Sequence, residues 1–121
     1  MDSHITFGYF LKSKRKEREV PIRKMAEMAG LAPGYLSDIE SGRRCPLDLE
    51  LLNRLAKSLS LAGADRDSLF DLAGKGRSAA PPDLVGYINN TKTARAALRL
   101  AKEKASDEDW QMFAFHLEAK E

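Results

Sequence analysis

Hydrophobic residues recur every three or four positions along nearly the whole chain, and no run alternates apolar with polar residues over the length of a strand. Spacing of this kind is typical of amphipathic helices. We therefore expect an all-α fold, with five helices in the first part of the chain and about three in the rest. The expected helical segments lie near residues 4–17, 22–29, 33–41, 52–59, 65–73, 83–89, 91–104 and 106–117.

Prolines, glycines and small polar residues mark where these helices begin and end. Pro21 and Pro33 stand where helices start, because proline is tolerated in the first turn but not inside a helix. Gly30 has the position of a left-handed residue that closes a helix. Asp65 and Ser106 are expected to cap the N-termini of the fifth and last helices with side-chain oxygens.

One segment has the composition of a linker. Residues 74–82 read Gly-Lys-Gly-Arg-Ser-Ala-Ala-Pro-Pro, which is small, basic and rich in turn formers. The chain of 121 residues suits one domain, or a small core with a short appendage. We predict a domain over 1–74, a linker over 75–81 and a helical extension over 82–121.

Composition excludes several classes of protein. Hydrophobic residues make up 43% and charged residues 31%, as in ordinary globular proteins. The single cysteine, Cys45, excludes an intramolecular disulfide framework. No apolar stretch approaches the roughly 20 residues that span a bilayer. We expect a cytoplasmic protein with no membrane partner.

The distribution of charge is more informative than the net charge of +2. Residues 1–62 hold 11 basic and 8 acidic side chains, whereas residues 63–121 hold 9 and 10. Within residues 12–24, seven basic groups stand against two acidic ones. Such a cluster forms either a surface that faces phosphates or a solvated helix face.

Two short helices with a glycine between them have the spacing of a helix-turn-helix. Ala26 is small where the second helix would cross the first, and Gly30 supplies the turn. Leu31 and Ile39 are apolar where the crossing must be buried. Any pair of antiparallel helices can imitate this pattern, so the spacing alone does not decide the function.

Residues 7–61 resemble the Cro/C1-type (XRE) helix-turn-helix family of phage repressors and bacterial regulators. The resemblance is carried by Lys-Ser-Lys-Arg at 12–15, Met-Ala-Glu-Met-Ala-Gly-Leu at 25–31, Tyr-Leu-Ser-Asp-Ile-Glu-Ser-Gly-Arg-Arg at 35–44, and Leu-Ala-Lys-Ser-Leu at 55–59. It implies a lambda-repressor-like domain of five helices that binds double-stranded DNA and regulates transcription, most often as a repressor.

The resemblance also assigns roles to residues. The helix over about 33–41 would lie in the major groove, with the preceding helix across the DNA backbone. Arg15 and Glu40 match a pair that bridges the first helix to the end of the third, a structural role. The implied DNA contacts, to bases and phosphates together, are Ile22, Arg23, Pro33, Gly34, Tyr35, Ser37, Asp38, Arg43 and Arg44.

The chain departs from the family pattern at several of these positions. Pro21 and Ile22 replace the usual capping residue and glutamine, and Ala32 replaces a Ser or Thr cap. Gly34 has no side chain with which to read a base. We therefore expect DNA shape and phosphate contacts to carry much of the affinity.

The last helix is apolar on more than one side. Trp110, Phe113 and Leu117 form a stripe, and Met112 and Phe115 lie off that stripe. One helix of a small domain rarely buries two faces. These five residues are either a homodimer interface or a surface that packs back on the first domain through the helix at 91–104.

A binding module for a partner protein, such as an antitoxin or adaptor, is the alternative function. An exposed apolar surface within residues 84–117 would favour it. We expect no enzyme, since the sequence lacks a nucleophile with a base, a metal-binding set and a glycine-rich phosphate loop. His4 and His116 have no metal-ligand neighbours at ligand spacing, so we expect no metal and no cofactor.

Overall fold

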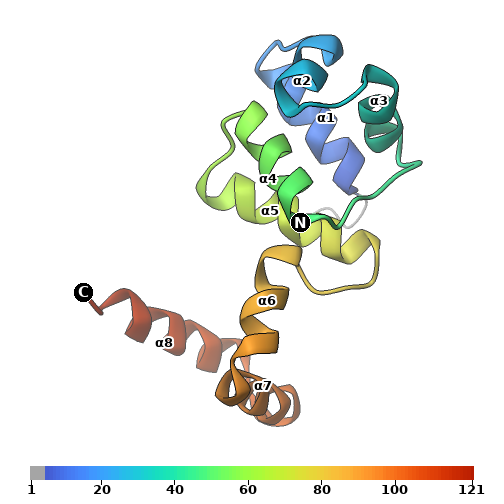
Figure 1. Cartoon of the computed structure of the whole chain (residues 1–121). Helices are drawn as coiled ribbons and strands as arrows, with labels where there is room; N and C mark the ends of the chain where they lie inside the picture. Colours follow the sequence, from blue (N-terminus) through green and yellow to red (C-terminus); the bar gives the residue numbers. More distant parts are fainter. Residues whose placement is uncertain (1–4) are drawn as a thin grey trace. The chain divides into compact units, whose positions relative to one another are not determined.

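The computed structural model describes residues 5–121, and these residues contain eight helices and no strand (Figure 1). The predicted all-α fold is thereby confirmed. The helices are α1 (Phe7–Glu17), α2 (Ile22–Ala29), α3 (Pro33–Ser41), α4 (Leu49–Ser58), α5 (Gly63–Gly76), α6 (Pro82–Asn90), α7 (Lys92–Lys104) and α8 (Asp107–Glu118).

The chain divides into two compact units. The first reaches Val85 and holds α1 to α5, and the second is Gly86–Glu121. Within residues 5–121, no helix combines the length and the apolar character needed to cross a bilayer.

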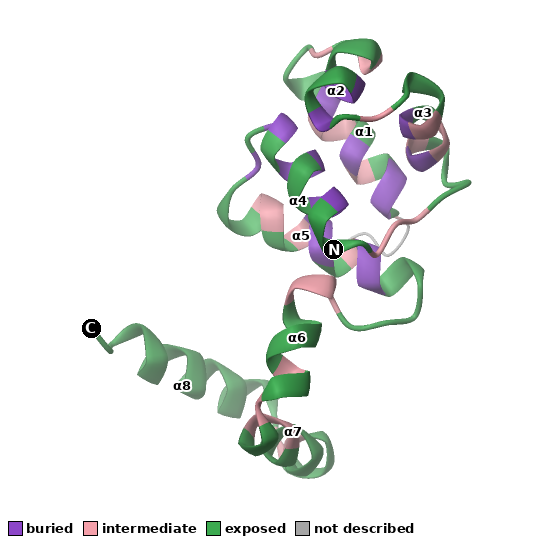
Figure 2. Ribbon diagram, in the orientation of Figure 1, coloured by how far each residue is buried: buried purple, intermediate pink, exposed green. Residues whose placement is uncertain are grey.

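The core of the first unit collects the apolar positions that the helical pattern singled out. Figure 2 shows buried positions on the facing sides of α1 to α5. Helix α1 packs against α3 and α5, and α2 packs against α3 and α4. The largest fully buried side chains are Leu11, Met25, Leu36, Ile39, Leu52, Leu55, Leu59, Leu69 and Phe70.

Gly8 allows α1 to approach the backbone at the end of α3. A Cβ atom at this position would lie 2.6 Å from the carbonyl oxygen of Glu40, and still closer to that of Ile39. Only a residue without a side chain fits there, since a real Cβ does not approach a backbone oxygen so closely. The first turn of α1 therefore helps to fix the end of α3.

Helix α5 begins earlier than expected, and the prediction of Asp65 as its N-cap is wrong. The helix starts at Gly63, with Ala62 in the capping position and no side chain of residues 5–121 as a cap. Asp65 lies in the first turn, with a carboxylate oxygen 3.4 Å from Nζ of Lys14. Its charge pairs with α1 instead of capping the helix.

The glycines at 74 and 76 lie inside α5, although their composition suggested a linker. Gly74 is buried, and a Cβ there would lie 2.8 Å from the backbone of Ala79 and Ala80. The amide of Ala79 donates to the carbonyl of Gly74 at 2.8 Å. Gly74 thus permits close backbone contact within the segment expected to be a linker.

In the second unit, hydrogen bonds fix the turn between α6 and α7 and the start of α8. Ser106 and Asp109 form a reciprocal capping box at the start of α8, which confirms the predicted cap at Ser106. Arg95 of α7 donates to the carbonyls of Ile88 and Asn89 at 2.9 and 2.6 Å, which ties α7 to the end of α6. The Trp110 and Phe113 rings meet edge to face, with 6.1 Å between their centroids.

Replacing Gly8 by alanine should destabilise the first unit by about 1–3 kcal/mol, because the added methyl group overpacks the α1–α3 contact. Gly34 occupies the same second position of its helix, but nothing lies within 4 Å of a Cβ built there. Gly34→Ala should be neutral or stabilise the fold by up to about 1 kcal/mol. Urea unfolding of both variants tests the contact, and equal midpoints would contradict it.

Candidate nucleic-acid interface

Helices α2 and α3 meet through small and apolar side chains around a left-handed turn. Ala26 of α2 is fully buried, as are Leu36 and Ile39 of α3. Gly30 has φ +73°, and the amide of Leu31 closes the turn by donating to the carbonyl of Ala26 at 2.8 Å. The structure therefore forms the helix-turn-helix that the spacing predicted.

One ion pair ties α3 to α1. Nε of Arg15 donates to Oε2 of Glu40 at 2.7 Å, and Nη2 of Arg15 donates to Oε1 of Glu40 at 3.0 Å. Nη1 of Arg15 donates to the carbonyl of Val20 at 2.8 Å. The two side chains are only 11% and 5% exposed. A single guanidinium thus joins α1, the turn before α2 and the end of α3.

The hydrogen bond to Glu40 raises the pKa of Arg15 above its ordinary value, although burial acts in the opposite direction. Arg15 therefore remains charged as the pH rises through the neutral range, and its contribution to stability does not fade there. The structure brings together the two residues to which the resemblance gave a structural role.

The outer side of α3 is open to solvent. Pro33, Gly34 and Ser37 are exposed, and Tyr35 and Asp38 are half-buried. Leu36 and Ile39 point into the core, and the half-buried Tyr35 also packs against it. Pro33, Gly34 and Ser37 are therefore the most accessible of the five predicted contacts of α3.

The loop after α3 places two arginines beside Asp38. Nε of Arg43 lies 3.3 Å from Oδ1 of Asp38, and Nε of Arg44 lies 3.7 Å from Oδ2. The guanidinium of Arg44 also lies over the Tyr35 ring, 5.0 Å from its centroid. Asp38, expected to accept a hydrogen bond from a base, faces the two predicted phosphate contacts in the free protein.

The other predicted contacts lie at the start of α2. Arg23 is exposed and Ile22 is half-buried against the core. Neither α2 nor α3 has a side-chain cap from residues 5–121 at its N-terminus, as Pro21 and Ala32 predicted. The first amides of α2 are consequently available to an acceptor from outside, which favours an anion. In α3, Pro33 has no N–H, and the Tyr35 amide donates to the carbonyl of Ala32 at 3.1 Å.

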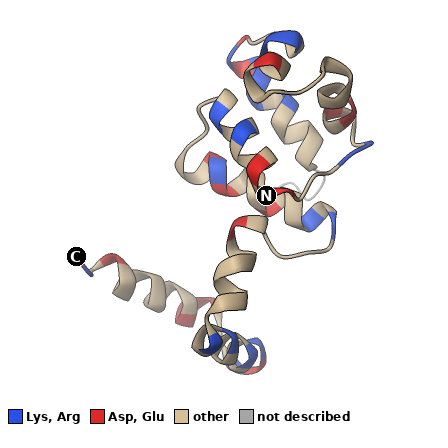
Figure 3. Cartoon of the chain, viewed as in Figure 1, with Lys and Arg blue, Asp and Glu red and all other residues tan. Residues whose placement is uncertain are grey.

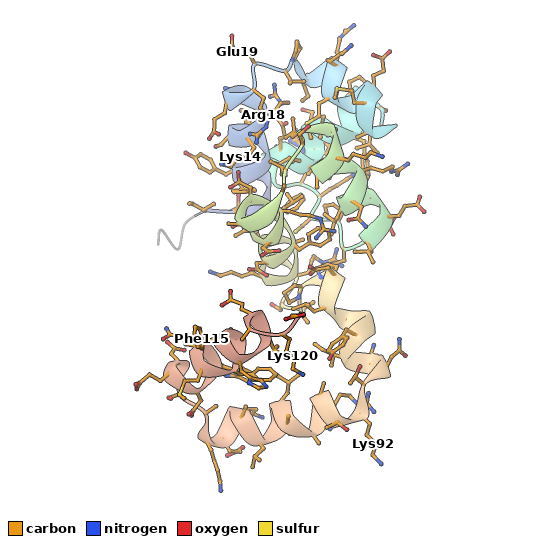
Figure 4. The ribbon with its side chains drawn as sticks, turned by 90° about the vertical axis from the view of Figure 1, so that its left-hand side faces the viewer. Lys14, Arg18, Glu19, Lys92, Phe115 and Lys120 are labelled. Carbon is orange, nitrogen blue, oxygen red and sulfur yellow. The ribbon has the colours of Figure 1, made fainter. Side chains whose placement is uncertain are left out.

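Part of the basic cluster over residues 12–24 is engaged within the protein. Arg15 turns inward to Glu40, whereas Lys14 lies 3.5 Å from Glu17 and 5.5 Å from the centre of the Phe10 ring. Figure 4 shows Lys14 on α1, and Arg18 and Glu19 just after the end of that helix. Neighbouring carboxylates and the core take up part of this charge, so the sum over these residues overstates the charge offered to a partner.

Sequence reasoning missed a hollow beside the arginine loop. It is open, has a volume of about 500 Å³ and involves residues from α3, the loop after α3 and the end of α5. Its lining residues are Tyr35, Gly42, Arg43, Arg44, Cys45, Pro46, Gly76 and Arg77. Arg77 was grouped with the linker, and only the basic character of that segment pointed to a role in binding.

The structure offers little support for metal or thiol chemistry. Within residues 5–121, no three His, Cys, Asp or Glu side chains gather where they could hold a metal ion. Burial raises the pKa of the Cys45 thiol, and the nearby Arg77 offsets only part of this shift. The thiol is therefore protonated at neutral pH, the form that reacts poorly as a nucleophile.

The five predicted interface residues of α8 are all exposed. Phe115 and Met112 are the most open, at 74% and 72%, and Trp110, Phe113 and Leu117 are partly covered. Trp110 and Phe113 border a small, largely apolar hollow with Ala97 and Ala101 of α7. Within the second unit, one side of α8 thus faces α7, while Met112 and Phe115 remain uncovered.

Comparison with known proteins finds a relationship for part of the first unit. Residues 11–61 match the family model described as helix-turn-helix. The match confirms the resemblance of this segment to helix-turn-helix proteins of the Cro/C1 type. The match covers α2, α3 and α4 with most of α1, and it leaves α5 to α8 outside.

Three curated relatives each align with a little under half of the chain. A protein named as an uncharacterized HTH-type transcriptional regulator, from two strains of Mycobacterium tuberculosis, is 36% identical over 55 residues. The ImmF control region 10 kDa protein of Bacillus phage phi105 is 41% identical over 54 residues. The alignments cover 46% and 45% of this chain, but 39% of the mycobacterial proteins and 59% of the phage protein.

Removing the carboxylate of Glu40 should destabilise the first unit by about 3–5 kcal/mol, because Glu40→Ala leaves the Arg15 guanidinium buried without its partner. Asp38→Ala removes two exposed ion pairs from the same helix and should cost at most about 1 kcal/mol. Chemical denaturation of both variants provides the comparison. Similar losses would show that the Arg15–Glu40 pair does not hold α3 in place.

Proposed function

We propose that this protein binds double-stranded DNA and regulates transcription, with α3 in the major groove and α2 across the backbone. The observation that carries the proposal is the exposed side of α3 with two accessible arginines in the loop that follows it. The α3 helix can enter the groove while Arg43 and Arg44 reach flanking phosphates. Repression follows if the occupied site lies within a promoter.

Few side chains on α3 are suited to reading bases. Ser37 can donate or accept a hydrogen bond, and Tyr35 can pack against a thymine methyl group. Gly34 has no side chain, and Asp38 would have to release two arginines before it could accept from a cytosine amino group. The proposed selectivity therefore rests largely on DNA shape and on the geometry of phosphate contacts.

Binding to duplexes from the protein's own promoter and to unrelated duplexes, titrated at two salt concentrations, tests the proposal. Arg43→Ala/Arg44→Ala should weaken binding and lower the slope of log K against log salt by about 1.8, since two phosphate contacts are lost. Arg54→Ala/Lys57→Ala removes the same charge from a separate hollow bordered by α4 and should bind nearly as the wild type.

Equal losses in the two double variants would show that only total charge matters, and the proposed docking of α3 would fail. Wild-type binding with no preference for any fragment would contradict sequence-specific regulation. That result would favour the alternative function, which is the binding of a partner protein.

We propose further that the protein forms a homodimer through its second unit. Helix α7 carries five basic and one acidic side chains, whereas α8 carries four acidic side chains and no Lys or Arg. No ion pair joins α7 to α8 within the described part of the chain. A two-fold contact in which α7 of each copy meets α8 of the other would pair these charges and cover Met112 and Phe115.

This complementarity favours a second copy over an unrelated protein as the occupant of the exposed apolar surface. A dimer also suits the first unit, because one short recognition helix reads few bases and two half-sites restore selectivity. Binding of a different protein partner by the same surface is the alternative.

Met112→Ala/Phe115→Ala should raise the dimer dissociation constant at least tenfold, because exposed apolar anchors lose their buried area in the contact. Neither side chain is buried within its own copy, so the fold should persist, as circular dichroism can verify. Tyr9→Ala, an exposed aromatic of α1, serves as the control in sedimentation velocity of the full chain. A wild-type monomer at every concentration would contradict the dimer and favour a partner protein.

A further inference from the structure

The end of α5 adds a cation to the surface on which the arginine loop lies. Arg77 follows the last residue of α5, and its guanidinium donates to the carbonyl of Cys45 at 3.0 Å. This hydrogen bond joins residues 32 positions apart and brings Arg77 beside the loop after α3. Figure 3 shows basic positions both on this loop and near the end of α5.

Close packing holds the two segments together. A Cβ atom at Gly76 would lie 2.8 Å from Sγ of Cys45, and the thiol in turn lies 3.7 Å from the carbonyl of Ala73. The last turn of α5 therefore packs directly on the residue that follows Arg44. Because these contacts are short, the position of Arg77 is set by packing as well as by its own hydrogen bond.

The hollow between these segments has the character of an anion site. Arg43, Arg44 and Arg77 all border it, and no carboxylate of residues 5–121 is among its lining residues. Asp38 lies outside the lining and pairs with Arg43 and Arg44. Arg77 forms no ion pair within the described residues, so its charge is the least compensated of the three.

We propose that Arg77 is a third phosphate contact, which extends the DNA-binding surface from the α3 loop to the end of α5. The ligand is a phosphodiester group of the duplex, held between Arg77 and the two loop arginines. This inference rests on the proposed function. It adds a binding residue that lies outside residues 11–61, the segment that matches the family model.

The contact would extend the footprint of one subunit along the backbone. An arginine that contacts phosphate strengthens binding to all duplexes alike and does not select a sequence. Arg77 thus adds to the affinity for every duplex, whereas the preference among duplexes rests on DNA shape and on the fit of α3 and its loop.

The test compares the wild-type chain with Arg77→Ala, Arg77→Lys and Arg54→Ala in duplex titrations over a range of salt. Arg77→Ala should weaken binding about three- to tenfold on promoter and unrelated duplexes alike, and lower the salt slope by about 0.9. Arg77→Lys restores the charge and should recover most of the loss. Arg54→Ala is the matched single-charge control and should change neither quantity substantially.

The outcomes separate this inference from the function on which it rests. If Arg77→Ala binds like the wild type while Arg43→Ala/Arg44→Ala loses affinity, the third contact is overturned and the α3 interface survives. If Arg77→Lys fails to rescue binding and both variants lose thermal stability, Arg77 only fastens the loop to α5. If the wild-type chain binds no duplex, both proposals fail.

An NMR titration distinguishes binding of duplex phosphate from binding of free phosphate. The Nε–H resonance of Arg77 is followed by NMR during titration with duplex, and separately with 1 mM inorganic phosphate at constant ionic strength. The duplex should shift this resonance and inorganic phosphate should leave it in place. A saturating shift with inorganic phosphate alone would assign the hollow to a free anion and overturn the DNA contact.

Discussion

The contact of Arg15 with Glu40 sets the position of α3, and most of the proposed interface depends on it. Helix α3 has nine residues and no side-chain cap from the described part of the chain, so it is too short to be stable by itself. Leu36 and Ile39 hold its inner side in the core, and Glu40 fixes its end to α1. The bond from Arg15 to Val20 also sets where the turn into α2 begins.

Because α3 is attached along one side, neighbouring residues of this helix have different roles. Residues at one side of the helix supply the apolar contacts, while those at the other side remain free to meet a ligand. The arginine loop begins where the helix ends at Gly42, whose φ of +90° turns the chain sharply. The attachment of α3 therefore also fixes the positions of Arg43 and Arg44, which lie in the loop and outside any helix.

Local signals predicted much of this structure. Helical spacing, together with prolines and glycines at helix ends, predicted the eight helices, although the start of α5 was placed two residues late. The core of α1 to α5 consists of apolar residues from these helices and the turns between them. The capping box at Ser106 followed from the chemistry of helix starts. The partnership of Arg15 and Glu40 came from the family resemblance, since nothing in composition links residues 25 positions apart.

Tertiary contacts explain what the sequence could not predict. From the local sequence, a glycine indicates a turn. Gly8, Gly74 and Gly76 instead lie in helices, where the missing side chain lets another segment come close. Asp65 has the chemistry of a cap, but the chain enters α5 two residues earlier and its carboxylate meets Lys14. The place of Arg77 beside Cys45 depends on how α5 packs, which no periodicity encodes.

Asp38 gives the arginine loop a built-in competitor. Its carboxylate is tethered five and six residues from the two guanidinium groups, and a short tether of this kind corresponds to an effective concentration of about the millimolar range. A small anion must outcompete this internal carboxylate at a single point. A polymer of phosphates contacts several cations at once, so its other contacts offset the loss of the Asp38 ion pairs. In the proposed function, this exchange favours a duplex, which offers several phosphates, over a single small anion.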